Sequence, residues 1–181
     1  MIEAFFVIIV LVEHYSTRTG TLLKITFYCF CRRDEKPINI PTVLPTRTFL
    51  EKIFLLSEEF SKDNPRHIRM SRHLYDLEKL MDTEYGKDAL KNIDLYSKIV
   101  NHRKNNYHLG YVDYSKHHPS TIAFTPPVDK MEKWNNDYRD MITNFIYEDK
   151  PKTFDELIKR MEELTGRLRD IEIDDNIIDN K

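Results

Sequence analysis

The sequence predicts an α+β protein in which a small N-terminal β region is followed by a mainly helical bundle. Two runs rich in β-branched and aromatic residues lie within the first 33 residues, and three prolines follow them. From there on, apolar residues recur at helical spacing. These observations divide the 181 residues into a strand region with an extended connector (1–44), a helical domain (45–173) and an acidic tail (174–181).

The N-terminal segment predicts two strands, over about 4–13 and 22–31, joined by a turn at 19–21. The apolar run 4–12 is far shorter than the roughly 20 residues that a membrane-spanning helix needs. We therefore expect a buried strand there, with no membrane segment and no signal peptide. Residues 34–47 contain three prolines and predict an extended connector, because each proline removes a backbone donor and resists helix.

Composition limits the class of protein. A hydrophobic content of 40% with only 4 glycines is typical of a globular, helix-rich chain. The formal net charge of −2 gives no case for nucleic-acid binding by the whole protein, so RNA binding would need a local basic face. Cys29 and Cys31 are too few for a disulfide framework or a zinc site, and we expect reduced thiols in a cytoplasmic protein. We also expect solvated loop histidines rather than metal ligands at 102, 108, 117 and 118.

Residues 45–80 predict two helices separated by a loop at Asn64-Pro65. The first has a capping-box pattern, with Thr48 as the expected N-cap and Glu51 three residues later. Each helix has one apolar face, formed in the first by Phe49, Ile53, Leu56 and Phe60 and in the second by Leu74, Leu77 and Met81.

Three more helices are expected in the rest of the chain. One runs from about 86 to 101. The other two carry the most regular apolar stripes, and a capping box at Thr153 and Glu156 begins the last one. Such stripes are packing surfaces between helices, and they consist of Met131, Trp134, Tyr138, Met141 and Phe145, then Leu157, Met161, Leu164, Leu168 and Ile171.

Two charged residues lie at the margins of the apolar faces of the first two helices. Lys52 precedes Ile53, and Asp76 stands between Tyr75 and Leu77. Two half-buried opposite charges on adjacent helices form either a structural salt bridge or the phosphate-side lysine and carboxylate of a nucleotide site. Residue spacing leaves both interpretations open.

The same segment carries two motifs. The first, P-x-R-T-F-x-E-K-x-x-x-L, stands at Pro45, Arg47, Thr48, Phe49, Glu51, Lys52 and Leu56. The second, S-R-H-x-Y-D-L, stands at Ser71, Arg72, His73, Tyr75, Asp76 and Leu77. In these motifs the chain resembles the AbiEii/AbiGii family of nucleotidyltransferase toxins. The resemblance covers roughly 38–171 and continues at His102-Arg103, Val112-Asp113-Tyr114, Asp137-Tyr138 with Met141, and Thr153-Phe154.

The resemblance implies a toxin of a toxin–antitoxin or abortive-infection system, which transfers nucleotides from a nucleoside triphosphate to an RNA acceptor such as tRNA. It also implies Mg²⁺ as a cofactor and a cognate antitoxin as a partner. Nucleotidyl transfer needs carboxylates that hold divalent ions. In the family these follow a Gly-Ser motif as a D-x-D pair on an N-terminal sheet, and this sequence has no such segment. We therefore expect the chain to correspond to a truncated, C-terminal portion of the family.

The resemblance also assigns candidate site residues. Lys52 and Asp76 match the lysine and aspartate of the family's active site. Lys52 would neutralise phosphate charge, and Asp76 would orient that lysine or hold a metal. Glu13 is the candidate metal carboxylate on a strand. Three arginines are candidates for binding nucleotide or RNA: Arg69, Arg72 and Arg103.

Two functional hypotheses follow. In the first, the chain is a nucleotidyltransferase toxin with Lys52 and Asp76 as catalytic residues. In the second, it is a non-catalytic helical module or remnant that binds nucleotide, RNA or an antitoxin. The missing D-x-D pair favours the second hypothesis, and the family resemblance favours the first.

Overall fold

A computed structural model describes residues 8–17, 20–29 and 38–172, and the side chains of residues 43–172. The chain divides into two compact units, residues 1–44 and residues 45–181. The dividing point falls between Leu44 and Pro45, where an extended strand gives way to a helix.

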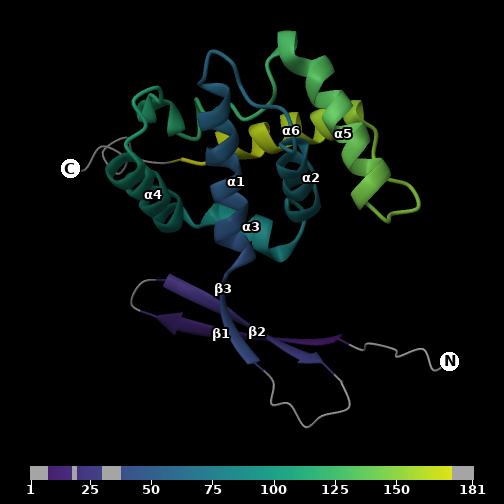
Figure 1. Ribbon diagram of the computed structural model, residues 1–181. Coiled ribbons are helices and arrows are strands. Elements are labelled where there is room, and N and C mark those ends of the chain that lie inside the picture. Colours follow the sequence, from purple (N-terminus) through teal and green to yellow (C-terminus); the bar gives the residue numbers. More distant parts are fainter. Residues whose placement is uncertain (1–7, 18–19, 30–37, 173–181) are drawn as a thin grey trace, which may run out of the picture. The chain divides into compact units, whose positions relative to one another are not determined.

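The first unit contains three antiparallel strands in the order β1-β2-β3 (Figure 1): β1 Ile8–Thr17, β2 Gly20–Cys29 and β3 Ile38–Val43. In the register, Thr17 is opposite Gly20, and Leu22 is opposite Val43. The expected boundaries are corrected: β1 continues past residue 13, and β3 occupies part of the expected connector. Pro41 fits this strand because β3 pairs only with β2 in the described sheet, and an edge strand tolerates the missing donor. Residues 4–7, 18–19 and 30–31 of the expected strands and turn lie outside the described residues.

The second unit is built from six α-helices (Figure 1): α1 Pro45–Phe60, α2 Ser71–Leu80, α3 Glu84–Lys91, α4 Ile93–His102, α5 Met131–Phe145 and α6 Phe154–Arg169. A π-helix, Arg103–Tyr107, continues α4, and two 3-10 helices span Tyr114–His117 and Val128–Lys130. α2 packs against α1, α5 and α6.

The expected α+β class is wrong for the part of the chain that holds the core. Between residues 45 and 172 the structure contains helices and loops and no strand, so this unit is all helical. The strands belong to a separate compact unit, and the helical core closes on itself without them. The reason is periodicity: residues 45–172 repeat their apolar positions every three or four residues, which no strand can bury on one face.

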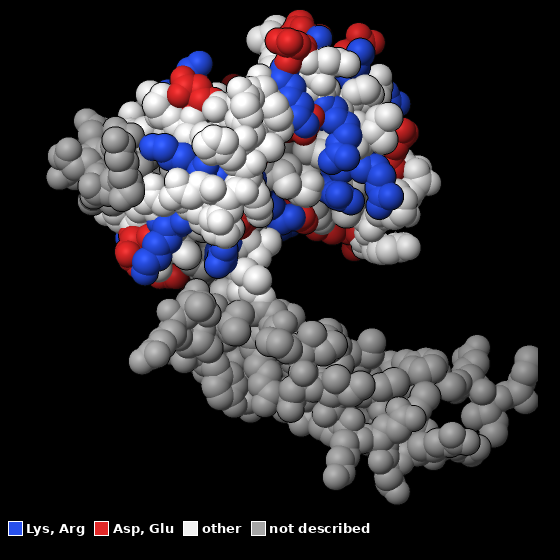
Figure 2. All heavy atoms as spheres, turned by 60° about the vertical axis from the view of Figure 1, so that its left-hand side comes forward, with Lys and Arg blue, Asp and Glu red and all other residues white. Residues whose placement is uncertain are grey.

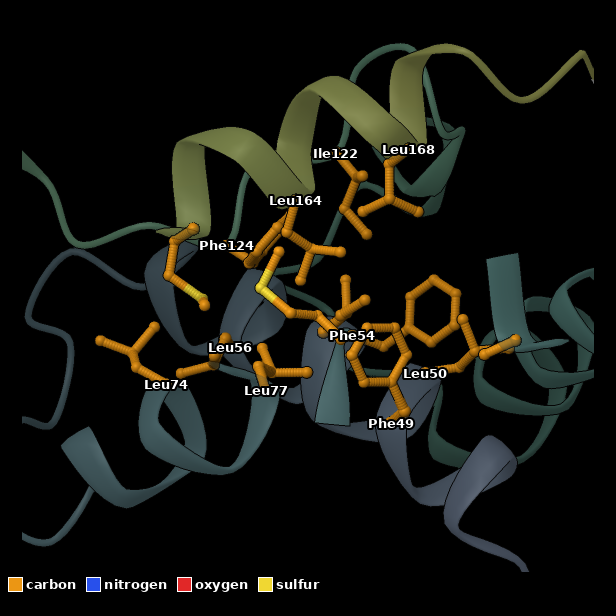
Figure 3. Close-up of a cluster of buried hydrophobic side chains, with 14 of the residues drawn as sticks. Phe49, Leu50, Phe54, Leu56, Leu74, Leu77, Ile122, Phe124, Leu164 and Leu168 are labelled. Atoms are coloured by element: carbon orange, nitrogen blue, oxygen red, sulfur yellow. The ribbon is translucent and has the colours of Figure 1, made fainter. Parts of the chain in front are cut away.

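The core of the helical unit lies where α1, α2 and α6 meet (Figure 3). Side chains of Phe49, Leu50 and Phe54 on α1 lie near those of Leu164 and Leu168 on α6, and all five are fully buried. Ile122 and Phe124, from the loop before α5, complete this cluster. The core is therefore assembled from segments more than 100 residues apart in sequence. None of the helices among the described residues is long and apolar enough to cross a membrane.

Local signals were partly right about where helices begin. The capping box is confirmed, since Thr153 accepts a hydrogen bond from the Glu156 N–H, and Glu156 accepts one from the Thr153 N–H. Thr48 is not an N-cap, because α1 begins at Pro45, whose fixed φ suits the first helical position. The expected helix over 86–101 is two helices, since Asn92 ends α3 and caps α4 through Leu95 N. Of the apolar stripe on α5, Trp134 and Tyr138 are buried, whereas Phe145 is exposed.

Candidate functional site

The structure joins the two charged residues that the sequence placed at helix margins. Lys52 projects from α1 and donates through Nζ to Asp76 Oδ2 on α2, at 2.6 Å. The lysine side chain is 19% exposed and the aspartate 40% exposed, so the pair is only partly shielded from water. The same Nζ lies 3.5 Å from Nδ1 of His73, which is one helical turn before Asp76.

His73 gives this cluster a fixed charge state. Burial, followed by the positive charges of Lys52 and Arg72, lowers the pKa of the His73 imidazole to about 4. At neutral pH the ring is therefore neutral and adds no second positive charge beside Lys52. The cluster then consists of one ammonium, one carboxylate and one neutral imidazole.

Asp76 also lines a cavity of about 330 Å³ between the start of α2 and the second half of α5. Arg69 and Arg72 line it as well and are exposed, so three of the predicted site residues share one cavity. The lining on α5 and just after it combines the apolar side chains of Met141, Phe145 and Ile146 with the carboxylates of Asp137 and Asp140. Cationic groups beside apolar side chains suit a phosphorylated ring compound.

One carboxylate from α5 sets the position of the arginines. Asp137 accepts backbone hydrogen bonds from Arg69 at 2.5 Å, from Met70 at 3.1 Å and from Ser71 at 2.9 Å, and its Oδ2 also accepts from the Ser71 hydroxyl. These bonds satisfy donors at the N-terminus of α2 that no side chain of α2 itself caps. Arg69 lies before the helix with a positive φ of 59°, so it is not on the helix face of α2 even though its spacing to Arg72 and Asp76 in the sequence is helical.

A second carboxylate, that of Glu148 in the loop after α5, binds two side chains further along α2. Tyr75 donates to Glu148 Oε1 at 2.6 Å, and Lys79 donates to Oε2 at 2.9 Å. Burial and the hydrogen bond to Glu148 raise the pKa of the Tyr75 phenol, so it stays protonated and keeps donating. α2 is thereby tied to α5 and its following loop at both ends.

Comparison with known proteins shows which family the chain belongs to. The sequence model of one protein family, described as nucleotidyl transferase AbiEii toxin of the type IV toxin–antitoxin systems, matches residues 12–160. The chain belongs to this family. No curated protein and no solved structure matches it. The match includes both motifs and every AbiEii candidate residue named above, from Glu13 to Arg103.

Arg103 of this AbiEii chain does not line the cavity that contains Asp76. It lies at the start of the π-helix and donates to both carboxylate oxygens of Glu58, at 2.7 and 2.6 Å, and also pairs with Glu51. Both the Arg103 and Glu58 side chains are only 7% exposed. Burial alone would lower the pKa of this guanidinium, but the hydrogen bond to Glu58 and its charge outweigh burial and raise it. The residue ties the π-helix to α1.

The structure does not test Glu13, the candidate metal ligand of the AbiEii chain. Glu13 lies on β1 opposite Lys24, in the first unit, and its side chain is outside the described part. Within the described residues no three His, Cys, Asp or Glu side chains form a group that could hold a metal ion. Asp76 is bonded to Lys52, and Asp137 is occupied by the α2 backbone. The described residues therefore do not fit a bound Mg²⁺.

Three supporting residues were not predicted as parts of the site: His73, Asp137 and Glu148. His73 stands inside the second motif, and Asp137 stands in a matched pair, so each had a local signal. Their roles depend on contacts across 21 and 66 residues of sequence, which residue spacing does not reveal.

Proposed function

We propose that this AbiEii-family chain serves nucleotidyl transfer in a type IV toxin–antitoxin system, with a nucleoside triphosphate as donor and an RNA such as tRNA as acceptor. The observation that supports the proposal is that Asp76 accepts a hydrogen bond from Lys52 and also lines a cavity with Arg69 and Arg72. A cognate antitoxin would be the partner that restrains the toxin, as the family description implies.

The proposed reaction needs positive charge at one place. An RNA hydroxyl forms a bond to the α-phosphorus, the bond to the bridging oxygen breaks, and pyrophosphate leaves while the hydroxyl proton passes to solvent. Negative charge builds up on the leaving pyrophosphate, and a fixed ammonium stabilises it. Lys52 suits this role because Asp76 holds its Nζ in place, and His73, being neutral, does not compete for the phosphate. Arg72 is exposed at the same cavity and would contact the outer phosphates.

The apolar side chains of the cavity support binding of the nucleoside part. Met141, Phe145 and Ile146 line the cavity together with the arginines and present a surface on which a base could pack. Carboxylates for Mg²⁺ would have to come from outside the described residues, because those residues assemble no such group.

A second candidate function follows from the absence of a metal-binding group among the described residues. As a non-catalytic helical module, the chain would bind nucleotide, RNA or antitoxin without turnover. The partly exposed Lys52–Asp76 pair would then serve binding alone.

Labelled nucleotide transfer onto total tRNA, with the purified chain and Mg²⁺, separates the two functions. Wild type is compared with Lys52→Ala, Asp76→Ala and Lys98→Ala, the last removing an exposed lysine of a simple helix-surface pair on α4. Incorporation that is lost in the first two variants and kept in the third supports transfer.

Nucleotide binding is measured in parallel by calorimetry with each triphosphate. Binding without incorporation, weakened by Lys52→Ala, would identify the non-catalytic module. If the folded chain neither binds nor transfers any nucleotide, the cavity has no role in nucleotide chemistry, and only a module that binds RNA or antitoxin would remain.

A further inference from the structure

A second cavity, of about 460 Å³, lies away from the Lys52–Asp76 pair and shares no lining residue with the first. It opens between the second half of α1, the segment before α2 and the chain from the π-helix to residue 111. Residues that are neighbours in the sequence nevertheless line the two different cavities. Met70 lines the second, whereas its neighbours Arg69 and Ser71 line the first.

Two tyrosine rings line this second cavity, which we call the tyrosine pocket. Tyr107 is 51% exposed and Tyr111 46% exposed, so half of each residue remains open to solvent. Leu55, Met70 and Leu109 supply an apolar lining beside them. The charged and polar residues Glu58, Glu59, Arg66, Arg103 and Asn106 complete the lining, so the two half-exposed rings are apolar surface that a ligand would cover.

Each ring is held by a cation that is itself held by a buried carboxylate. The Arg103 guanidinium lies 5.0 Å from the centre of the Tyr107 ring and is fixed by Glu58. The Lys62 ammonium lies 5.4 Å from the centre of the Tyr111 ring and donates to Glu59 at 2.7 Å. Such contacts orient the rings before any ligand arrives, which lowers the entropy lost on binding. Arg103 thus acts on this pocket through Tyr107.

The backbone under the rings departs from regular helix. Residues Arg103–Tyr107 form a π-helix, and His108 follows with a positive φ of 46°. A π-helix and a left-handed non-glycine residue are both rare and frequently mark functional sites. At the rim, Arg66 is exposed, and its guanidinium contacts the Met70 thioether, which is a weak acceptor.

We propose that the tyrosine pocket binds an unpaired nucleobase by stacking on Tyr107 and Tyr111, with Arg66 on the adjoining phosphate. Stacking on aromatic rings is how proteins hold single-stranded RNA without reading its sequence. Figure 2 shows Lys and Arg side chains on one face of the helical unit, with Asp and Glu side chains among them. At the pocket itself, Arg66 and Arg103 supply the positive charge that an RNA phosphate needs. The inference rests on the proposed function, because the base would belong to the RNA acceptor.

The test uses the full chain and a short single-stranded RNA containing one 2-aminopurine, whose fluorescence is quenched on stacking. The variants are Tyr107→Ala, Tyr111→Ala and, to keep the ring, Tyr107→Phe. Tyr147→Ala is the matched control, since Tyr147 is 96% exposed and lines neither cavity. We expect each pocket alanine to weaken RNA binding roughly 5- to 100-fold and to abolish the quenching. The Phe and control variants should keep both signals.

Two further measurements separate the possible sources of the base. A free nucleoside monophosphate that displaces the RNA from wild type, and fails to bind the alanine variants, would assign the pocket to free nucleotides. Arg66→Ala should reduce the slope of log affinity against log salt by about 0.7, the loss of one phosphate contact on a single strand.

Unchanged RNA affinity and quenching in both alanine variants would overturn the proposal, and so would a wild-type chain that binds neither RNA nor mononucleotide. Binding of a purified antitoxin that is lost in the alanine variants, with RNA binding intact, would instead make the pocket a protein-binding surface and also overturn it. Triphosphate binding at Lys52 is measured separately, so loss of the pocket and loss of the nucleotide site are distinguished. A chain that binds no RNA would also contradict the RNA acceptor of the proposed function.

Discussion

Two ion-pair clusters of the helical unit have similar chemistry and opposite surroundings. Lys52 and Asp76 join α1 to α2 at an open cavity, with the carboxylate 40% exposed. Arg103, Glu58 and Glu51 join the π-helix to α1 with the arginine 7% exposed. A buried pair that loses one partner leaves an uncompensated charge, whereas an exposed pair contributes little to stability. The Lys52–Asp76 cluster is therefore expected to contribute little to stability, whereas the Arg103 cluster is expected to stabilise the fold.

The largest expected effect comes from breaking the buried cluster. Arg103→Met should lower the free energy of unfolding by about 3–5 kcal/mol, because Glu58 would stay buried without its partner. Urea denaturation measures the loss. Lys98→Met, which breaks the exposed pair with Asp94, is the control and should change stability by less than about 0.5 kcal/mol. Equal losses in the two variants would mean that burial of an ion pair does not determine how much stability is lost when the pair is broken.

Each cluster has a histidine beside it, half-buried His73 or buried His117, and both should make stability depend on pH. Burial lowers the pKa of His117 to about 4, and neither of its ring nitrogens has a hydrogen-bond partner among the described residues. The expectation of a solvated histidine at this position was therefore wrong. The pKa of His73 is also lowered to about 4. The unfolded chain, with a histidine pKa near 6.5, binds more protons between the two values, so stability falls as pH drops from about 6.5 to 4.

Removing one histidine should flatten this pH dependence. His117→Leu should reduce the loss of stability between pH 6.5 and pH 4 by on the order of 2–3 kcal/mol, since the leucine cannot take up a proton. Urea midpoints at several pH values give the profile. The same profile in His102→Leu, which replaces an exposed histidine, should stay close to wild type. A steep acid slope that persists unchanged in His117→Leu would contradict the lowered pKa.

Removing Asp137, which binds the start of α2 beside the Lys52–Asp76 cluster, should lower stability by a smaller amount. Asp137→Ala removes the acceptor for three backbone N–H groups before and at the start of α2, and we expect a loss of about 1–2 kcal/mol. Nucleotide affinity should fall as well, because Arg69 and Ser71 line the cavity. Thermal unfolding and calorimetry measure the two effects. Asp140→Ala, one turn further along α5, should leave stability within about 0.5 kcal/mol of wild type.

The smallest change in stability is expected at the open pair itself. Lys52→Ala should lower the free energy of unfolding by less than about 1 kcal/mol, since the Asp76 carboxylate it leaves is well solvated. Its effect on triphosphate binding should be far larger than its effect on stability, and that contrast sharpens the comparison with Arg103. A loss of stability as large as that of Arg103→Met would make Lys52–Asp76 a structural salt bridge.

The sequence by itself determined the helices of the second unit and the residues that could form its site. Apolar spacing predicted α1, α2, α5 and α6, and the capping box at Thr153 was sufficient to place the start of α6. The two motifs also pointed to Lys52 and Asp76, because these charges stand at the edges of apolar faces. Such features depend on neighbours within one or two helical turns.

Only the tertiary structure decided which charged residues are buried and which are open. Arg103 and Arg72 are the same residue type, yet Arg103 is buried against Glu58 and Arg72 is exposed at the cavity. The α2 terminus takes its cap from Asp137, 66 residues away, and not from a residue of its own turn. Electrostatic roles follow from solvation, and solvation is set by how distant helices pack.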